Sequence, residues 1–308
     1  AVFTVLVVLT FKSQYITFST GTLLFVCDAL LWFIAYKRCK GRCEPPLIAI
    51  FLVLILPPLI GYASIYNLLN YVKALRGPED RVRAVAWYVY TTTIHSRHAL
   101  IGSIFRSYCD PLKYLVVGVA ACGEMANYES HLLGELGFQT RVVQFLGENH
   151  AFLEVYLNGT WIVSDPGYPK FHLATREERA RGRIQEVGAV SYVCAVEDGR
   201  NVELTDKYVA TDTIVIIVVR SGEPLKGAKV RLVHKFGGSR MEVPCTPLYT
   251  DDEGKVVLKL GRMSYNERAQ PAEDYYWVYV NDQNTGVRVA SSGEGRTRYV
   301  RVDVSSRD

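Results

Sequence analysis

Three side chains in the middle of the 308-residue chain have the types and the order of an activated nucleophile. They are Cys122, His150 and Asp165, with 28 residues from the cysteine to the histidine and 15 from the histidine to the aspartate. A carboxylate that accepts from one ring nitrogen orients the histidine and leaves the other nitrogen to exchange a proton with a thiol. These residue types therefore predict nucleophilic catalysis by Cys122.

Cys122 opens a segment with helical periodicity. The pattern predicts a helix over Ala121–Leu136 that ends at Gly137, a residue suited to a left-handed cap. The apolar residues on the side of Cys122 are expected to pack inward: Met125, Ala126, Leu133 and Leu136. Glu129 shares this face, and the apolar pattern gives it no role. Because a helix N-terminus stabilises an anion, we expect the pKa of the thiol to be lowered. Taken alone, the helix also fits a small, buried and inert cysteine.

His150 and Asp165 stand at the outer ends of a predicted hairpin. Residues 139–168 indicate a strand and then two arms that meet at Asn158-Gly159, a strong signal for a tight turn. With a two-residue turn there, position 150 faces about position 167, so Asp165 lies nearly across from His150. His131 is a poor alternative base, because nine residues along a helix turn it about 180° away from Cys122.

The segments "ACGEMA", "LGFQTRVV" and "NHAFLEVYLNGTWIVSDPGY" follow one another within residues 118–168, and this stretch resembles the transglutaminase-like cysteine-enzyme superfamily. The resemblance implies a papain-like α+β core with Cys122 as nucleophile, His150 as base and acid, and Asp165 as the orienting acid. It also implies acyl transfer through a thioester, with backbone N–H groups at the helix start as candidate oxyanion donors. Phe152 departs from the family, which usually has Trp after the histidine.

The resemblance implies an enzyme that acts on amide bonds of a peptide or protein substrate, either a cysteine protease or peptidase or a transglutaminase-like amidase. An alternative from another class is a catalytically inactive, membrane-anchored peptide-binding or adhesion module with the same fold. A third interpretation is a disulfide between Cys109 and Cys122 in an oxidising compartment.

From about Val209 the pattern changes to short strands with turn signals. Residues of period two predict strands with one buried face: Val230, Leu232, Val256, Leu258 and Leu260. The pattern indicates a small antiparallel sandwich. "GEPLKGAKVRLV" followed by "TDDEGKVVLKL" resembles the carboxypeptidase-regulatory or bacterial Ig-like domains, which implies a spacer, adhesive or positioning module.

Two apolar runs near the start are each long enough to cross a bilayer: Tyr15–Tyr36 and Leu47–Tyr66. Buried core helices of a soluble protein are the alternative. Asp28 lies within the first run, and residues 1–11 are apolar but too short to span. The basic loop 37–44 favours a cytoplasmic position for the loop and an outside position for everything after the second run. We therefore expect a multi-pass cell-membrane protein with extracytoplasmic catalytic and C-terminal domains.

The predicted fold class is α+β, with two N-terminal transmembrane helices, a papain-like transglutaminase core of a helix packed on an antiparallel sheet, and a C-terminal β-sandwich. The corresponding domains are residues 1–70, 71–208 and 209–308.

Composition excludes several other classes of function. The net charge of +4 comes largely from groups near the apolar runs. The chain therefore has no long basic stripe of the kind that binds nucleic acid. The seven cysteines form no C-x-x-C pair, and we expect no metal site and no cofactor. The oligomeric state stays open.

Overall fold

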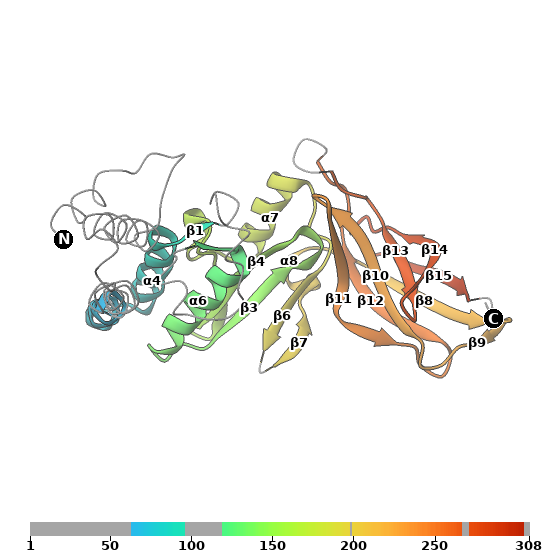
Figure 1. Cartoon of the computed structure of the whole chain (residues 1–308), viewed down its shortest axis with the longest axis horizontal. Coiled ribbons are helices and arrows are strands. Elements are labelled where there is room, and N and C mark those ends of the chain that lie inside the picture. The colour runs from blue at the N-terminus through green and yellow to red at the C-terminus, as the bar shows by residue number, and fades with distance from the viewer. Residues whose placement is uncertain (1–62, 96–118, 198, 267–270, 305–308) are drawn as a thin grey trace, which may run out of the picture. The chain divides into compact units, whose positions relative to one another are not determined.

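The computed structural model describes residues 63–95, 119–197, 199–266 and 271–304 (Figure 1). Its contacts divide the chain into two compact units. The first holds the described residues up to Thr140 together with Val155–Leu173. The second holds Arg141–Glu154 and the described residues from Ala174 onward. The domain boundaries expected from the sequence stay a prediction.

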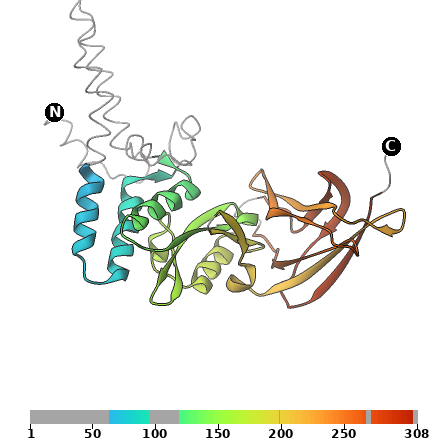
Figure 2. The same ribbon diagram turned by 90° about the horizontal axis from the view of Figure 1, so that it is seen from below.

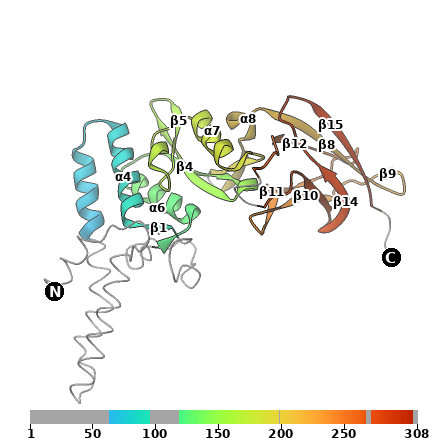
Figure 3. The ribbon, with the colours of Figure 1, turned by 90° about the horizontal axis from the view of Figure 1, so that it is seen from above.

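Two helices open the first unit. Residues 63–74 are helical, and α4 (Pro78–Thr92) follows after a short turn. Proline in the first turn and the acidic residues beside it suit a helix N-terminus. Figure 2 and Figure 3 show the two helices side by side, and the hydroxyls of Ser64 and Tyr88 lie 3.0 Å apart between them. As the sequence predicts, one stripe of α4 is buried: Val82, Val85, Ala86 and Val89.

The helix that begins with the candidate nucleophile is α6 (Cys122–Gly134). It follows the short strand β2 (Val119–Ala120), which pairs in parallel with β1 (Ile94–His95). Gly137 has φ +82°, and the N–H of Phe138 donates to the carbonyl of Leu133 at 3.0 Å. The predicted left-handed conformation of Gly137 is therefore confirmed, whereas the helix itself ends at Gly134, two residues before the predicted Leu136.

A five-stranded sheet carries the predicted hairpin. Its strand order is β5-β4-β3-β6-β7. The strands are β3 (Thr140–Phe145), β4 (His150–Leu157), β5 (Thr160–Ser164), β6 (Val193–Glu197) and β7 (Arg200–Glu203). Asn158 and Gly159 both have positive φ, 50° and 85°, as a type I′ turn requires. The predicted two-residue turn between β4 and β5 is confirmed.

Short helices fill the connections of this sheet. They are η2 (Leu146–Glu148) before β4, η3 (Pro169–Phe171) after β5, α7 (Arg176–Val187) before β6, and α8 (Thr205–Tyr208) after β7. Four residues after His150 on β4, the buried carboxylate of Glu154 accepts hydrogen bonds from Arg141, Arg176 and Tyr208. These charge-assisted bonds tie β4 to β3, α7 and α8.

Two further sheets, here called the C-terminal sheets, follow along the chain. One has the order β11-β10-β13-β14, and the other β12-β8-β15, with β9 beside β8. Their strands are β8 (Thr211–Arg220), β9 (Glu223–Pro224), β10 (Lys229–Phe236), β11 (Ser239–Tyr249), β12 (Lys255–Gly261), β13 (Tyr276–Val280), β14 (Gln283–Val289) and β15 (Thr297–Asp303). The two sheets share one apolar core that includes the alternating residues expected to be buried.

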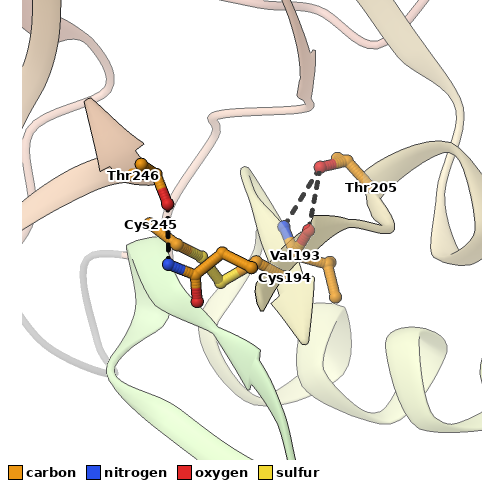
Figure 4. Close-up of a disulfide and its surroundings, with 6 residues drawn as sticks. Val193, Cys194, Thr205, Cys245 and Thr246 are labelled. Carbon is orange, nitrogen blue, oxygen red and sulfur yellow. Dashed lines mark hydrogen bonds between the residues drawn. A yellow bond between two sulfur atoms is a disulfide. The ribbon is translucent and has the colours of Figure 1, made fainter. Parts of the chain in front are cut away.

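A disulfide joins Cys194 on β6 to Cys245 on β11 (Figure 4). Next to it, the hydroxyl of Thr205 accepts from the N–H of Val193 at 3.1 Å. The cross-link ties the five-stranded sheet to the C-terminal sheets within the second unit. The sequence analysis did not predict this pair, because 51 residues separate the two cysteines.

The predicted fold class is wrong. The described chain is rich in sheet, with several separate and mainly antiparallel sheets. The helix after Cys122 packs against α4 and also makes side-chain hydrogen bonds to β3 and β5 of the five-stranded sheet. No helix within the described ranges is both long enough and apolar enough to cross a membrane. The prediction treated the strands as one sheet under a helix and one sandwich, because a period of two shows that a segment is a strand and gives no information on which strands pair.

The first apolar run, residues 1–11 and Asp28 lie outside the described residues, as does most of the second run. Of the second run, residues 63–66 are described, and they begin the helix beside α4. Tyr66 in this helix is 68% exposed.

Candidate active site

Cys122 is the first residue of α6, and its side chain is half-buried. The preceding Ala121 is extended, with φ −81° and ψ 168°. Its N–H donates to the carboxylate of Glu124 at 2.6 Å, which is the carboxylate half of a capping box. This bond fixes the angle at which the chain enters the helix, and so fixes the position of Cys122.

Glu129, which had no role in the sequence pattern, is a buried acid two turns beyond Cys122. Its side chain is 0% exposed, and Oε1 accepts from the hydroxyl of Ser164 at 2.5 Å. Its Oε2 makes no hydrogen bond with any described residue. Burial raises the pKa of Glu129 to about 8, the charge of Asp165 adds to this, and the Ser164 hydrogen bond opposes it. Glu129 is therefore mainly protonated at neutral pH.

The raised pKa of Glu129 makes folding stability fall as pH rises. Above the unfolded pKa of about 4.5 only the folded protein holds this proton, so the free energy of unfolding drops by up to about 1.4 kcal/mol per pH unit until pH 8. Glu129→Gln keeps an acceptor for Ser164 and cannot titrate, so we expect a flatter slope between pH 5 and 8. Urea unfolding at several pH values measures it, with the exposed Glu135→Gln as control. An unchanged slope in Glu129→Gln would show that Glu129 is already ionised in the folded protein.

Asp165 directly follows the last residue of β5 and is 1% exposed. Its N–H donates to the carbonyl of Phe171 at 3.0 Å, and its own carbonyl accepts from Tyr168 at 3.0 Å. Its carboxylate Oδ1 accepts from the N–H of Gly167 at 3.1 Å. This closed turn holds the carboxylate in one orientation.

His172, a histidine near Asp165, was missed by the sequence analysis. It is 4% exposed and makes edge contacts with Trp87 and Tyr90, at ring-centre distances of 6.0 and 6.2 Å. Burial lowers the pKa of His172, the charge of Asp165 opposes this, and Arg83 adds to the lowering. No described residue hydrogen-bonds its Nε2. A spacing of seven residues does not predict that His172 lies near Asp165. The helical turn η3 between them reverses the chain and places His172 close to Asp165.

His150 is the first residue of β4 and is buried. Asn149 before it is left-handed, with φ 49°. The imidazole stacks on Phe152, with 6.0 Å between ring centres and 25° between planes, and lies 6.5 Å from the ring of Phe145. The guanidinium of the buried Arg179 covers both phenylalanine rings. Phe152 therefore gives the imidazole a flat apolar surface, and this contact restricts the rotation of His150.

Cys122 and Asp165 belong to the first compact unit and His150 to the second, and β4 runs from one into the other. The three-residue site predicted from the sequence stays a prediction. Within the described ranges, no three His, Cys, Asp or Glu side chains form a metal-binding group.

No protein-family model and no curated protein matches this chain. Two solved structures resemble part of it. A candidate cysteine protease from Cytophaga hutchinsonii is 17% identical over 35% of this chain and 37% of its own, with a TM-score of 0.29. A transglutaminase ("TGase") is 19% identical over 44% of this chain and 37% of its own, with a TM-score of 0.26. The chain thus spans little more than a third of the length of either structure.

Proposed function

We propose that this protein is a thiol enzyme that cleaves or exchanges amide bonds of peptides or proteins, with Cys122 as nucleophile, His150 as base and acid, and Asp165 as the orienting acid. The observation that carries the proposal is the place of Cys122. The thiol is half-buried at the first residue of a capped helix, where the helix dipole stabilises a thiolate.

The hairpin supports the choice of partners. Its two-residue turn at Asn158-Gly159 is the turn from which the sequence predicts that Asp165 lies nearly across from His150. His150 begins one arm and Asp165 follows the end of the other. A carboxylate at that place accepts from one nitrogen of the imidazole and directs the second nitrogen toward a thiol.

The proposed reaction has two steps. The Cys122 sulfur attacks the amide carbonyl carbon, His150 takes the thiol proton and passes it to the leaving amine, and a thioester forms. Water, or a second amine, then gives a proton to His150 and attacks the thioester. The acid or the new amide leaves, and the proton returns to the sulfur.

Mass-spectrometric capture of the acyl-enzyme tests this function. Incubating the full chain with a mixture of peptides should add an acyl mass to the peptide that contains Cys122, and His150→Gln should prevent the addition. Turnover of casein or a glutamine peptide that disappears in Cys122→Ala separates an enzyme from a module that only binds peptides. Binding of peptides without any acyl adduct or turnover would favour the binding module.

The Cys194–Cys245 disulfide supports an extracytoplasmic location for the described part of the chain, since such bonds persist mainly in oxidising compartments. Protease treatment of intact cells should then remove these residues. Complete protection, together with cleavage after lysis, would reverse the assignment.

A further inference from the structure

Residues far along the chain hold the turn that leads into His150. The turn η2 lies between β3 and β4 and packs against β6, β10 and β11. The N–H of Leu146 donates to the carbonyl of Tyr192 at 3.0 Å. The carbonyl of Gly147 lies 2.8 Å from Nε2 of His234 on β10, and this nitrogen must carry a hydrogen because a carbonyl only accepts. The backbone ahead of His150 is therefore fixed by the C-terminal sheets.

The carboxylate of Glu148, at the end of this turn, is fully buried. Its Oε1 accepts three hydrogen bonds, from the N–H of Ser191 at 2.9 Å, the hydroxyl of Ser191 at 2.6 Å and the hydroxyl of Tyr265 at 2.8 Å. Because the Ser191 hydrogen points to this carboxylate, Tyr276 on β13 donates to Ser191, at 2.7 Å. The backbone carbonyl of Glu148 accepts from the guanidinium of Arg183.

Close packing around Gly147 restricts the position of η2. A Cβ at Gly147 would overlap the hydroxyl of Ser191 and come within 2.5 Å of the hydroxyl of Tyr276. Two residues later the left-handed Asn149 passes the chain into β4 at His150. A shift of η2 would break several buried hydrogen bonds at once, each costly to leave unmade.

We propose that Glu148 positions His150. Ser191 and Tyr265 hold Glu148, and Tyr276 holds Ser191, so the C-terminal sheets keep the proposed base in place. The inference rests on the proposed function, in which His150 moves the proton. Glu148 is a positioning residue that acts through the backbone of the turn. Displacing a catalytic group by about 1 Å can lower a rate on the order of 100-fold.

Two variants of Glu148 separate its role as acceptor from its charge. Glu148→Gln keeps an oxygen for Ser191 and Tyr265, whereas Glu148→Leu has none. Val278→Ala is the matched control, because Val278 is buried in the core of the C-terminal sheets two residues beyond Tyr276 and makes no side-chain hydrogen bond. It should lower the stability of these sheets without releasing the turn.

The experiment uses the full chain and two measurements. Proton–nitrogen NMR follows the imidazole of His150, whose signals are identified by their loss in His150→Gln, and peptide turnover is measured in parallel. We expect Glu148→Leu to shift the His150 signals and to lower turnover on the order of 100-fold. Glu148→Gln and Val278→Ala should keep both close to wild type. If Glu148→Leu does not fold, Tyr276→Phe, which removes one hydroxyl, takes its place with the same expected shift of the His150 signals.

Unchanged His150 signals in folded Glu148→Leu, or in folded Tyr276→Phe where it is used, would overturn the inference. So would an equal shift in Val278→Ala at the same loss of stability. The NMR measurement needs no activity, so it still decides the positioning role if Cys122→Ala shows that the proposed function is wrong.

Discussion

Replacing His150 with Gln is expected to lower kcat/KM for peptide cleavage by roughly 10⁴- to 10⁶-fold, the loss found when the base of a nucleophile–base pair is removed. Gln cannot take the thiol proton, so both thioester formation and its hydrolysis lose their proton carrier. Steady-state cleavage of a fluorogenic peptide measures the effect. Pre-steady-state bursts would show whether acylation or deacylation suffers more.

His172→Gln is the matched control for this loss, because His172 is a buried histidine near Asp165. Its ring lies edge-on to Trp87 and Tyr90, so its main contacts are with aromatic side chains. We therefore expect His172→Gln to keep most of the activity. The reverse pattern, with activity lost in His172→Gln and retained in His150→Gln, would make His172 the base.

The sequence predicted the parts of the site that depend on local pattern. The left-handed Gly137 and the Asn158-Gly159 turn follow from backbone preferences of single residues, and both are present. The buried stripe of α4 and the alternation on β10 and β12 follow from helical and strand periods, and these too are present.

Features that depend on distant residues could not be predicted. Glu129 stood out as an acid on an apolar face, but its partner Ser164 lies 35 residues away. The hydrogen bond that holds η2 joins Glu148 to Tyr265, 117 residues later. Periodicity shows that a side chain is buried and gives no information on which polar group lies opposite it. The same limit explains why the C-terminal sheets resembled a spacer in sequence although they hold the turn before His150.

The second large effect is expected from Asp165→Asn, which should lower kcat/KM by about 10⁴-fold. The amide oxygen can still accept from the N–H of Gly167, so the turn and the global stability should be kept. What is lost is the negative charge that selects the tautomer of His150 and stabilises the imidazolium. Thermal unfolding of the variant close to that of wild type would exclude misfolding as the cause.

A second readout of Asp165→Asn does not depend on activity. The charge of Asp165 contributes to the raised pKa of Glu129, so its removal should lower that pKa. The pH range in which stability falls would then end below pH 8. If the stability profile moves in this way while kcat/KM stays at the wild-type level, Asp165 is an ionised neighbour of Glu129 with no part in orienting His150. If both change together, the same carboxylate acts on the buried acid of α6 and on the base of Cys122.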